Sequence, residues 1–475
     1  MEHYDLAVIG GGSAGLTAAF AAGRIGARVV LVDKQRLGGD CTHTGCIPSK
    51  ALIKAAKVAH TVRTASRFGV KASSAEVDFA GVMAHVKQAI ETVEAGETPE
   101  ILADKGVDVM FGGATFLSPT RLKVGDEEIE ADHSIIAVGA SAAAPPIPGL
   151  EETGYLDNHS LFSIEELPAR LAIIGGGPIG VEMGQAFARL GSKVTIIEAG
   201  PRILGRDDAE LATLLMVRLA DELEVMTESR VVGALAREEH KVVRVSRDGA
   251  EVEVEADAIL VAAGRRPRFD GLGLEAAGVE IGKRGIAIDS TLRTTAKNIW
   301  AAGDCVGQMQ FTHFAEAQAR VAVRNALFTG SSKFDGEVMP WTTFADPELA
   351  HVGLTEEQAR EAHGDRAQVY RYSYADLDRA ITEGEGFGLA KVVCDTKGKI
   401  LGASMLGPHS GEAISEIVVA MNQGIGLSEL AKSVHPYPTM NRIVRRLGDQ
   451  RFMEQGVGDW TTRLFGRFKG KKKAV

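Results

Sequence analysis

Two cysteines, Cys41 and Cys46, are the residues whose type and spacing most directly indicate chemistry in this chain. Two intervening residues would suggest a zinc site or a thioredoxin-type pair, but four residues separate these cysteines. On a regular helix, positions i and i+5 lie about 140° apart, since each residue turns about 100°. A disulfide needs Cα atoms about 4.4–6.8 Å apart, so we expect the first helical turn here to be distorted. The pattern favours a redox-active dithiol over two buried structural thiols.

A glycine-rich unit precedes the cysteine pair. Its predicted parts are a buried strand at 4–9, the motif Gly10-x-Gly12-x-x-Gly15, an Ala-rich helix at 13–24, a strand at 28–32 and Asp33 at its end. The motif alone is weak evidence, but this strand–loop–helix–strand–acid context is typical of a dinucleotide site. The glycines let the backbone approach a pyrophosphate at the helix N-terminus, and the acid can accept hydrogen bonds from a ribose.

The same unit recurs in the middle of the chain. Its parts are a strand at 171–174, the motif Gly175-x-Gly177-x-x-Gly180, a helix to Leu190, a strand at 193–197 and Glu198. The first glycine and the acid are 23 positions apart in both copies, from 10 to 33 and from 175 to 198. Pro178 falls in the first helical turn, where its missing N–H costs little. Two copies at matched spacing indicate two dinucleotide sites.

Length and composition narrow the class of protein. A chain of 475 residues predicts three or four domains. The formal charge of −10 argues against generic nucleic-acid binding. Met1-Glu2-His3 leads directly into a strand and no apolar run reaches 18 residues, so we expect a cytoplasmic protein without signal peptide or spanning helix. The other two cysteines, Cys305 and Cys394, have no cysteine nearby in sequence and are expected to be packing residues.

Between and after the glycine motifs, the pattern alternates between helix and strand. Predicted elements are helices at 51–65 and 79–95, β segments at 107–111 and 121–124, a strand at 134–138 before Gly139, a linker at 144–149, a strand at 258–263 before Gly264, a strand at 299–302 before Gly303 and Asp304, and a helix at 315–328 capped by Thr312. From Met339 to about Arg451, strands and helices continue without glycine-loop motifs.

The last twenty residues, 456–475, differ from the rest. Six bases and Asp459 give this tail a net charge of +5, and apolar residues recur at roughly helical spacing. A basic amphipathic segment can lie on an anionic membrane surface, which would make the protein peripheral. Basic tails are also often simply solvated, and Gly466 and Gly470 weaken a helix.

Nearly the whole chain resembles the class I pyridine nucleotide-disulfide oxidoreductases, in the branch of dihydrolipoamide dehydrogenase and mercuric reductase. Five motifs in family order carry the resemblance: Gly10–Gly15, Cys41–Lys50, Gly175–Gly180, Ala301–Asp304 and 435–439 (His-Pro-Tyr-Pro-Thr). The resemblance implies an α/β fold with two Rossmann-like domains, for FAD and NAD(P), and a C-terminal α+β dimerisation domain. The expected ranges are 1–150 (FAD domain, first part), 151–265 (NAD(P) domain), 266–340 (FAD/central domain), 341–455 (dimerisation domain) and 456–475 (tail).

The resemblance also implies roles for individual residues. Cys46 would be the flavin-proximal thiol and Cys41 the interchange thiol, while Lys50 and Glu182 would form an ion pair beside flavin N5. Asp33 would hold the adenosine ribose of FAD and Asp304 its ribityl chain. The full set of cofactor-binding residues expected is Gly10, Gly12, Ser13, Ala14, Gly15, Asp33, Lys34, Gly39, Lys50, Gly139, Gly303 and Asp304 for FAD, with Gly175, Gly177, Pro178, Ile179, Gly180, Glu198 and Gly264 for NAD(P)H. No metal site is expected.

The chain departs from the family at the C-terminal motif. Disulfide-reducing members place a His before Pro-Thr and a Glu five residues later, where this chain has Tyr437 and Arg442. Tyrosine titrates near pH 10, about three units from the neutral value that suits a general base, so Tyr437 is a catalytic candidate of unusual type. Mercuric reductases share the Tyr but carry a C-terminal cysteine pair, and this sequence has no cysteine after Cys394. His435, two residues upstream, would point elsewhere in an extended segment.

These features leave several functions open. The favoured one is an FAD-dependent NAD(P)H oxidoreductase whose dithiol serves an undefined acceptor: a disulfide, a soft metal ion or a quinone. The alternatives are a membrane-surface NADH:quinone diaphorase, a dihydrolipoamide dehydrogenase with an altered acid–base site, and a non-catalytic scaffold. The intact redox motif argues against the scaffold. NADH is favoured over NADPH because Glu198 would repel a 2′-phosphate, although Arg202 softens that repulsion. The resemblance further implies a homodimer and a cis Tyr437–Pro438 bond.

Overall fold

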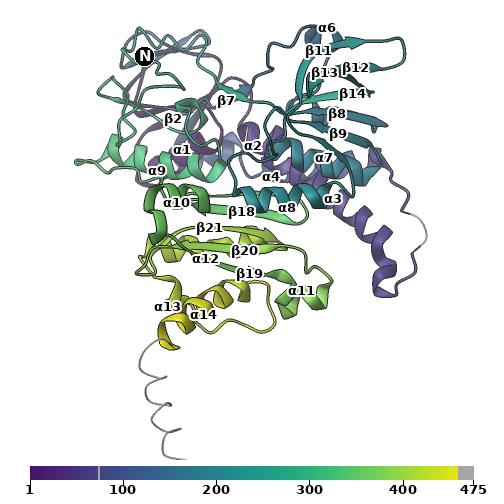
Figure 1. Ribbon diagram of the computed structural model, residues 1–475. Coiled ribbons are helices and arrows are strands. Elements are labelled where there is room, and N and C mark those ends of the chain that lie inside the picture. The colour runs from purple at the N-terminus through teal and green to yellow at the C-terminus, as the bar shows by residue number, and fades with distance from the viewer. Residues whose placement is uncertain (73–74, 458–475) are drawn as a thin grey trace, which may run out of the picture. The chain divides into compact units, whose positions relative to one another are not determined.

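The first glycine motif lies at the carboxyl end of a parallel strand within a mixed sheet. A computed structural model describes residues 1–72 and 75–457 (Figure 1). In it β1 (Glu2–Ile9) pairs in parallel with β2 (Val29–Asp33) on one side and β6 (Glu127–Ile136) on the other. Leu6, Ala7 and Val8 are fully buried. Such a continuous apolar run is expected of a strand covered on both faces.

This sheet has seven strands in the order β3-β2-β1-β6-β5-β4, with β16 beside β6. The remaining strands are β3 (Val107–Phe111), β4 (Ala114–Phe116), β5 (Arg121–Val124) and β16 (Ile299–Ala301). Helices α1 (Ser13–Arg24) and α9 (Thr312–Leu327) pack against each other. Small buried residues such as Ala18, Ala19, Ala319 and Ala322 let the two helices approach closely over one apolar cluster. Because β1 and β16 are both parallel to β6, the carboxyl ends of β1 and β16 lie at the same edge of the sheet.

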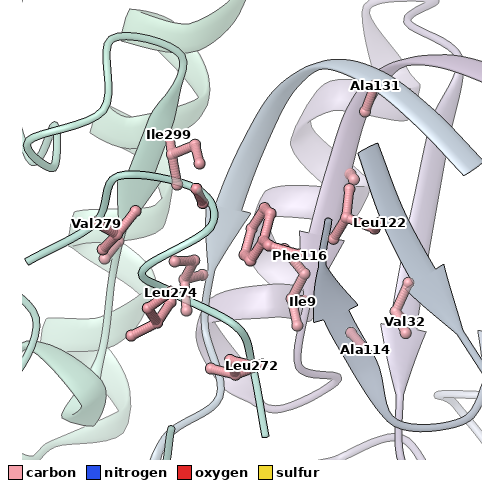
Figure 2. Packing of buried hydrophobic residues seen from close by; sticks show 14 of the residues in the cluster. Ile9, Val32, Ala114, Phe116, Leu122, Ala131, Leu272, Leu274, Val279 and Ile299 are labelled. Atoms are coloured by element: carbon pink, nitrogen blue, oxygen red, sulfur yellow. The ribbon is translucent and has the colours of Figure 1, made fainter. Parts of the chain in front are cut away.

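A second apolar cluster lies against the same sheet. Phe116 and Leu122 from the antiparallel β4–β5 hairpin meet Ile9 and Val32 (Figure 2). The irregular segment that follows β15 (Arg265–Pro267) contributes Leu272, Leu274 and Val279 to the same core. Gly273 sits where a Cβ would lie 2.6 Å from the Phe116 carbonyl oxygen, with φ +65. Residues far apart in sequence thus close one core around the strands that carry the first glycine motif.

The cysteine motif spans two helices rather than one. α2 (Gly39–Thr44) carries Cys41, and α3 (Cys46–Thr64) begins at the second cysteine. Gly45 breaks the helical path with φ −131 and ψ −112, and a Cβ there would lie 2.7 Å from the Asp40 carbonyl oxygen. The expected distortion is confirmed. α4 (Phe79–Glu94) packs on α3, and α5 (Pro99–Ala103) follows.

The middle of the chain contains the second glycine motif. Its elements are β7 (Ala140–Ala142), α6 (Leu150–Thr153), β8 (Arg170–Ile174), α7 (Pro178–Leu190), β9 (Lys193–Ile197), α8 (Ala209–Leu219), β10 (Glu224–Met226), β11 (Arg230–Ala236), β12 (Lys241–Arg247), β13 (Ala250–Ala256), β14 (Ala258–Val261) and β15 (Arg265–Pro267). β8 pairs in parallel with β14, β11-β12-β13 form an antiparallel meander, and β15 pairs antiparallel with β7. The β8–loop–α7–β9 order reproduces the N-terminal unit.

The C-terminal part is an α+β layer. Its five-stranded sheet runs β17-β18-β21-β20-β19, and every neighbouring pair is antiparallel. The elements are β17 (Pro340–Thr343), β18 (Glu348–Gly353), α10 (Glu356–His363), β19 (Gln368–Ser373), α11 (Asp378–Glu383), β20 (Leu389–Cys394), β21 (Ile400–Gly407), α12 (Ser410–Asn422), α13 (Leu427–Leu430) and α14 (Arg442–Val457). α12 packs on β18 and β21, and Cys394 is buried in their core, as expected of a packing residue.

Two units emerge from the chain path. One contains 1–175, 186–195 and 230–336, and the other 176–185, 196–229 and 337–475. The domain ranges inferred from the sequence therefore stay predictions, and the basic tail lies outside the described residues from 458 onward. Across residues 1–72 and 75–457, no helix combines the length and apolar character needed to cross a membrane.

Candidate functional site

The β1–α1 loop forms a backbone cradle. Gly10, at φ +109, sits where a Cβ would lie 2.4 Å from the Ala137 carbonyl oxygen, so only glycine fits. Gly39, at φ +62, brings the start of α2 so close that a Cβ would lie 2.7 Å from the Gly12 Cα. The N-cap residue is Gly12, which has no side chain to cap the helix. The first N–H groups of α1, including those of Ser13 and Ala14, can therefore bind an anion.

Asp33 closes the cradle at the end of β2. Its Oδ2 accepts a hydrogen bond from the Gly11 N–H at 2.8 Å, and its Oδ1 accepts from the Gln35 and Arg36 N–H groups at 2.9 and 3.1 Å. A carboxylate has about four acceptor sites, so one remains for a ribose hydroxyl. Lys34, next in sequence, is exposed. The loop geometry fits the pyrophosphate and ribose of a dinucleotide.

Asp304 follows β16 and lies in a polar cluster. Its Oδ2 is 3.4 Å from Nη2 of Arg265, which also donates to Asp40 Oδ2 at 2.6 Å. Burial raises the pKa of Asp304, and the Arg265 guanidinium opposes that rise. The adjacent Gly303 donates its N–H to Gln318 Oε1 at 2.8 Å. Gly139, at φ +70, has open space where a Cβ would stand. A half-buried carboxylate kept beside a cation suits the hydroxyls of a ribityl chain, so the residues present fit FAD.

Cys41 and Cys46 are not joined by a disulfide, and they differ in exposure. Cys46, the first residue of α3, is exposed, and its Sγ lies 3.6 Å from Thr312 Oγ1. Cys41 is half-buried, and a hydrogen bond with Cys46, together with burial, raises the pKa of the Cys41 thiol. The raised pKa favours the protonated form of Cys41, and the roles of the two thiols stay predictions.

Thr312 does not cap α9 as the sequence suggested. The N-cap is Phe311, which makes no side-chain cap hydrogen bond, and Thr312 is the first helical residue. Its hydroxyl is directed to Cys46 instead. The ring of His313 stacks on Phe311 with centroids 5.6 Å apart. α9 thus presents a hydroxyl and its positive end to the thiol.

Lys50 and Glu182 belong to different units of the chain. Lys50 Nζ donates to Ser49 Oγ at 3.3 Å. Glu182 is buried, and its Oε1 accepts a hydrogen bond from the Phe344 N–H at 2.8 Å. Their ion pair stays a prediction.

The second glycine loop repeats the geometry of the first. Glu198 accepts hydrogen bonds from the Gly176 N–H at 2.7 Å and the Gly200 N–H at 2.6 Å, as Asp33 does from Gly11. Gly175, at φ +112, has its would-be Cβ 2.8 Å from the Ala262 carbonyl oxygen. Of the other predicted residues, Gly177 has open space where a Cβ would stand, Gly264 is exposed at φ +119, Pro178 and Ile179 are exposed at the start of α7, and Gly180 is buried.

The C-terminal motif contains a cis Tyr437–Pro438 bond, as predicted. Tyr437 is 64% exposed, and the Arg442 guanidinium stacks over its ring, 4.7 Å from the centroid. His435 is buried, with Nε2 3.0 Å from both carboxylate oxygens of Glu416. His435 Nδ1 lies 3.2 Å from the Ser433 carbonyl oxygen. A His–Glu pair is therefore present here, although two residues upstream of the family position.

Sequence reasoning missed the contacts that cross the fold. Asp40 and Arg265 are separated by 225 residues, and no local pattern links them. Glu416 had no motif to mark it. Thr42 Oγ1 also donates to Glu97 Oε2 at 3.2 Å, which gives α2 a second anchor. Within the described ranges, no group of three or more His, Cys, Asp and Glu side chains could hold a metal ion.

Comparison with known proteins identifies the family of the chain. Residues 4–319 match the pyridine nucleotide-disulphide oxidoreductase family, and residues 339–447 match its dimerisation domain. The chain is 37% identical to a dihydrolipoyl dehydrogenase of Thermus scotoductus, over 93% of this chain and 96% of the relative. It is 34% identical to a mercuric reductase of Bacillus cereus, over 92% of this chain and 70% of the relative.

Among solved structures, the chain resembles the HOCl-induced flavoprotein disulfide reductase RclA from Escherichia coli in its Cu(II) complex. The TM-score is 0.85 at 33% identity, covering 95% of this chain and all of the other. The matched dimerisation domain supports a homodimer. The chain belongs to the pyridine nucleotide-disulphide oxidoreductases and is an FAD-dependent enzyme of that family that uses NAD(P)H.

Proposed function

We propose that this enzyme passes two electrons from NAD(P)H to the Cys41–Cys46 pair and from there to an acceptor that needs no general acid at Tyr437, either a thiophilic metal ion or a quinone. The observation that carries the proposal is the asymmetry of the thiols. Cys46 is exposed beside the Thr312 hydroxyl, and Cys41 holds its proton. FAD, when bound, supplies the two-electron relay between the nicotinamide and this pair.

The chain's own residues prepare the dithiol for reaction. The Thr312 hydroxyl and the N-termini of α3 and α9 stabilise negative charge at Cys46. When the dithiol is oxidised, the S–S bond forms between Cys41 and Cys46, and the Cys41 proton passes to solvent or to the quinone that is being reduced. The two electrons go to one Hg²⁺, to one quinone or to two Cu²⁺. The helix break at Gly45 allows the two sulfurs to approach. No step of this exchange requires Tyr437 to transfer a proton.

The nature of the acceptor is inferred from the C-terminal motif. Tyr437 is stacked under a fixed cation, and a phenol near neutral pH is a poor proton relay. Two relatives carry a soft or redox-active metal in their names, a mercuric reductase and the Cu(II) complex of RclA. Both observations support a metal ion as electron acceptor rather than a disulfide.

A second candidate is reduction of a small disulfide, as in dihydrolipoyl dehydrogenase. The observation that favours it is the His435–Glu416 pair, since a histidine held by a carboxylate is the usual device for proton transfer. Both ring nitrogens of His435 already contact oxygen atoms, so it would have to leave one of them to reach a substrate.

A steady-state screen of NADH oxidation separates these functions. The acceptors are Cu²⁺, Hg²⁺, menadione, lipoamide and glutathione disulfide, each assayed with wild type and with Cys41→Ser. We expect dithiol-dependent turnover with at least one metal ion or quinone, and slow turnover of both disulfides. Fast lipoamide reduction that His435→Asn abolishes would favour the second candidate. Equal rates in wild type and Cys41→Ser with every acceptor would refute a dithiol relay.

A further inference from the structure

Arg265 joins three distant segments beside the dithiol. It lies on β15 and donates from Nη2 to Asp40 Oδ2 at 2.6 Å and to the Ala140 carbonyl oxygen at 3.1 Å. The same nitrogen is 3.4 Å from Asp304 Oδ2. The side chains of Arg265, Asp40 and Asp304 are 20%, 25% and 19% exposed, so the cluster is largely shielded from water. Ion pairs shielded in this way are screened less than surface pairs.

The two carboxylates have different tasks. Asp40 immediately precedes the interchange cysteine on α2, and Asp304 is the residue expected to hold the ribityl chain. Without a cation between them they would repel each other, since Asp40 raises the pKa of Asp304 and Arg265 lowers it, against a larger effect of burial. Arginine suits this place because its planar fork serves several acceptors at once.

We propose that Arg265 is a positioning residue that ties the helix carrying Cys41 to Asp304, so that the interchange thiol and the FAD ribityl site are held by one side chain. The inference rests on the proposed function. It extends that function by assigning FAD retention and Cys41 placement to a residue that contacts neither a substrate nor a sulfur atom. Arg268, 3.7 Å from Asp40 and 45% exposed, is a weaker second cation in the cluster.

The test compares five variants. Arg265→Met removes the cation, Arg265→Lys keeps the charge without the fork, and Asp40→Asn removes one carboxylate charge. Arg265→Met with Asp40→Asn removes both partners. Arg266→Met is the matched control, because Arg266 lies next on the same strand with an exposed side chain.

The first readout is the Kd for FAD, measured by titrating the apoprotein. Hydrogen bonds between charged groups typically change an equilibrium about 10-fold or more, so Arg265→Met should weaken FAD binding about 10-fold. The Kd of Arg265→Lys for FAD should lie between the values for Arg265→Met and wild type. The Kd of Arg266→Met should stay within about two-fold of wild type. Adding Asp40→Asn to Arg265→Met should increase FAD affinity about three-fold over Arg265→Met alone, because the second substitution removes the unpaired carboxylate. General damage to the fold would not be rescued by a second substitution.

The second readout is alkylation of Cys41 by iodoacetamide in a Cys46→Ser background. The remaining cysteines, Cys305 and Cys394, are fully buried, so Cys41 is the thiol that reacts. Arg265→Met should change this rate several-fold with and without FAD, since the tether to Asp40 does not involve the cofactor. Asp40→Asn should shift the rate in the same direction, which keeps the test valid even where Arg265→Met fails to fold.

The proposal is overturned by an Arg265→Met protein with FAD affinity within two-fold of wild type. It is equally overturned by a double variant that loses more affinity than Arg265→Met alone, or by a Cys41 rate that no substitution moves. None of these readouts uses an acceptor or turnover. A wrong assignment of the acceptor would therefore leave the FAD affinities and alkylation rates unchanged. Conversely, if Arg265 does not position Asp40 and Asp304, the outcome of the acceptor screen is unaffected.

Discussion

The Thr312 hydroxyl should set the pH at which the reactive thiolate forms. Its Oγ1 lies 3.6 Å from Cys46 Sγ, at the first residue of α9. A hydrogen bond to a charged group typically contributes about 1.5–3 kcal/mol, and the exposure of Cys46 places this one at the low end of the range. A loss of about 1.4 kcal/mol corresponds to about one pH unit. Thr312→Val, which keeps the shape and removes the donor, should therefore shift thiolate formation upward by about one unit.

The assay is the long-wavelength absorbance of the thiolate beside oxidised flavin, titrated against pH in the anaerobic two-electron-reduced enzyme. Thr312→Ser is the matched control, because it keeps the hydroxyl and should titrate within about 0.3 units of wild type. A Thr312→Val enzyme with an unchanged midpoint would show that the helix termini alone stabilise the Cys46 thiolate. That result would refute the reasoning from the contact.

Three further predictions concern the rest of the chain. The double substitution Tyr437→His with Arg442→Glu should raise lipoamide turnover about 10²-fold by restoring a general acid, and Tyr437→Phe is the control. If wild type already turns over lipoamide as fast as the double variant, proton transfer would be assigned to His435. Asp207 is buried and accepts a hydrogen bond from Trp341 Nε1, and burial raises its pKa to about 6. The protonated carboxyl group therefore stabilises the fold below about pH 4, and this stabilisation is lost as the pH rises through about 6. Relative to wild type, Asp207→Asn should therefore have a free energy of unfolding that is higher at pH 8 than at pH 4, by up to about 3 kcal/mol. An equal difference from wild type at both pH values would contradict this. NADH should give a higher kcat/KM than NADPH, and Glu198→Ala should narrow the ratio; a wild-type preference for NADPH would assign the pocket to Arg202.

Much of the local structure could be predicted from the sequence because the signals are local. The helix at 13–24 and the strands at 107–111, 121–124 and 193–197 have the predicted bounds. A glycine motif between a buried strand and an Ala-rich run leaves few alternatives to this turn. The distortion at the cysteine pair also followed from geometry, and Gly45 provides it.

The parts that could not be predicted depend on contacts across the fold. Thr312 carries a good capping side chain, yet an N-cap must precede the first helical residue, and here Phe311 takes that place. The pairing of Arg265 with Asp40 needs β15 to lie beside the start of α2, which no local pattern encodes. His435 was expected to point away from the family position, and its partner Glu416 lies on α12, 19 residues upstream. Side-chain chemistry in a motif is readable from sequence, but the neighbours that tune it depend on the tertiary fold.

The central claim, a dithiol relay through Cys41 and Cys46, is tested most directly by anaerobic reduction with one equivalent of NADH. A dithiol relay should give the long-wavelength thiolate–flavin absorbance together with two newly titratable thiols. Cys46→Ser should abolish the band, and Cys41→Ser should leave a thiolate near the flavin. Direct bleaching of the flavin in wild type, with neither the band nor new thiols, would contradict it.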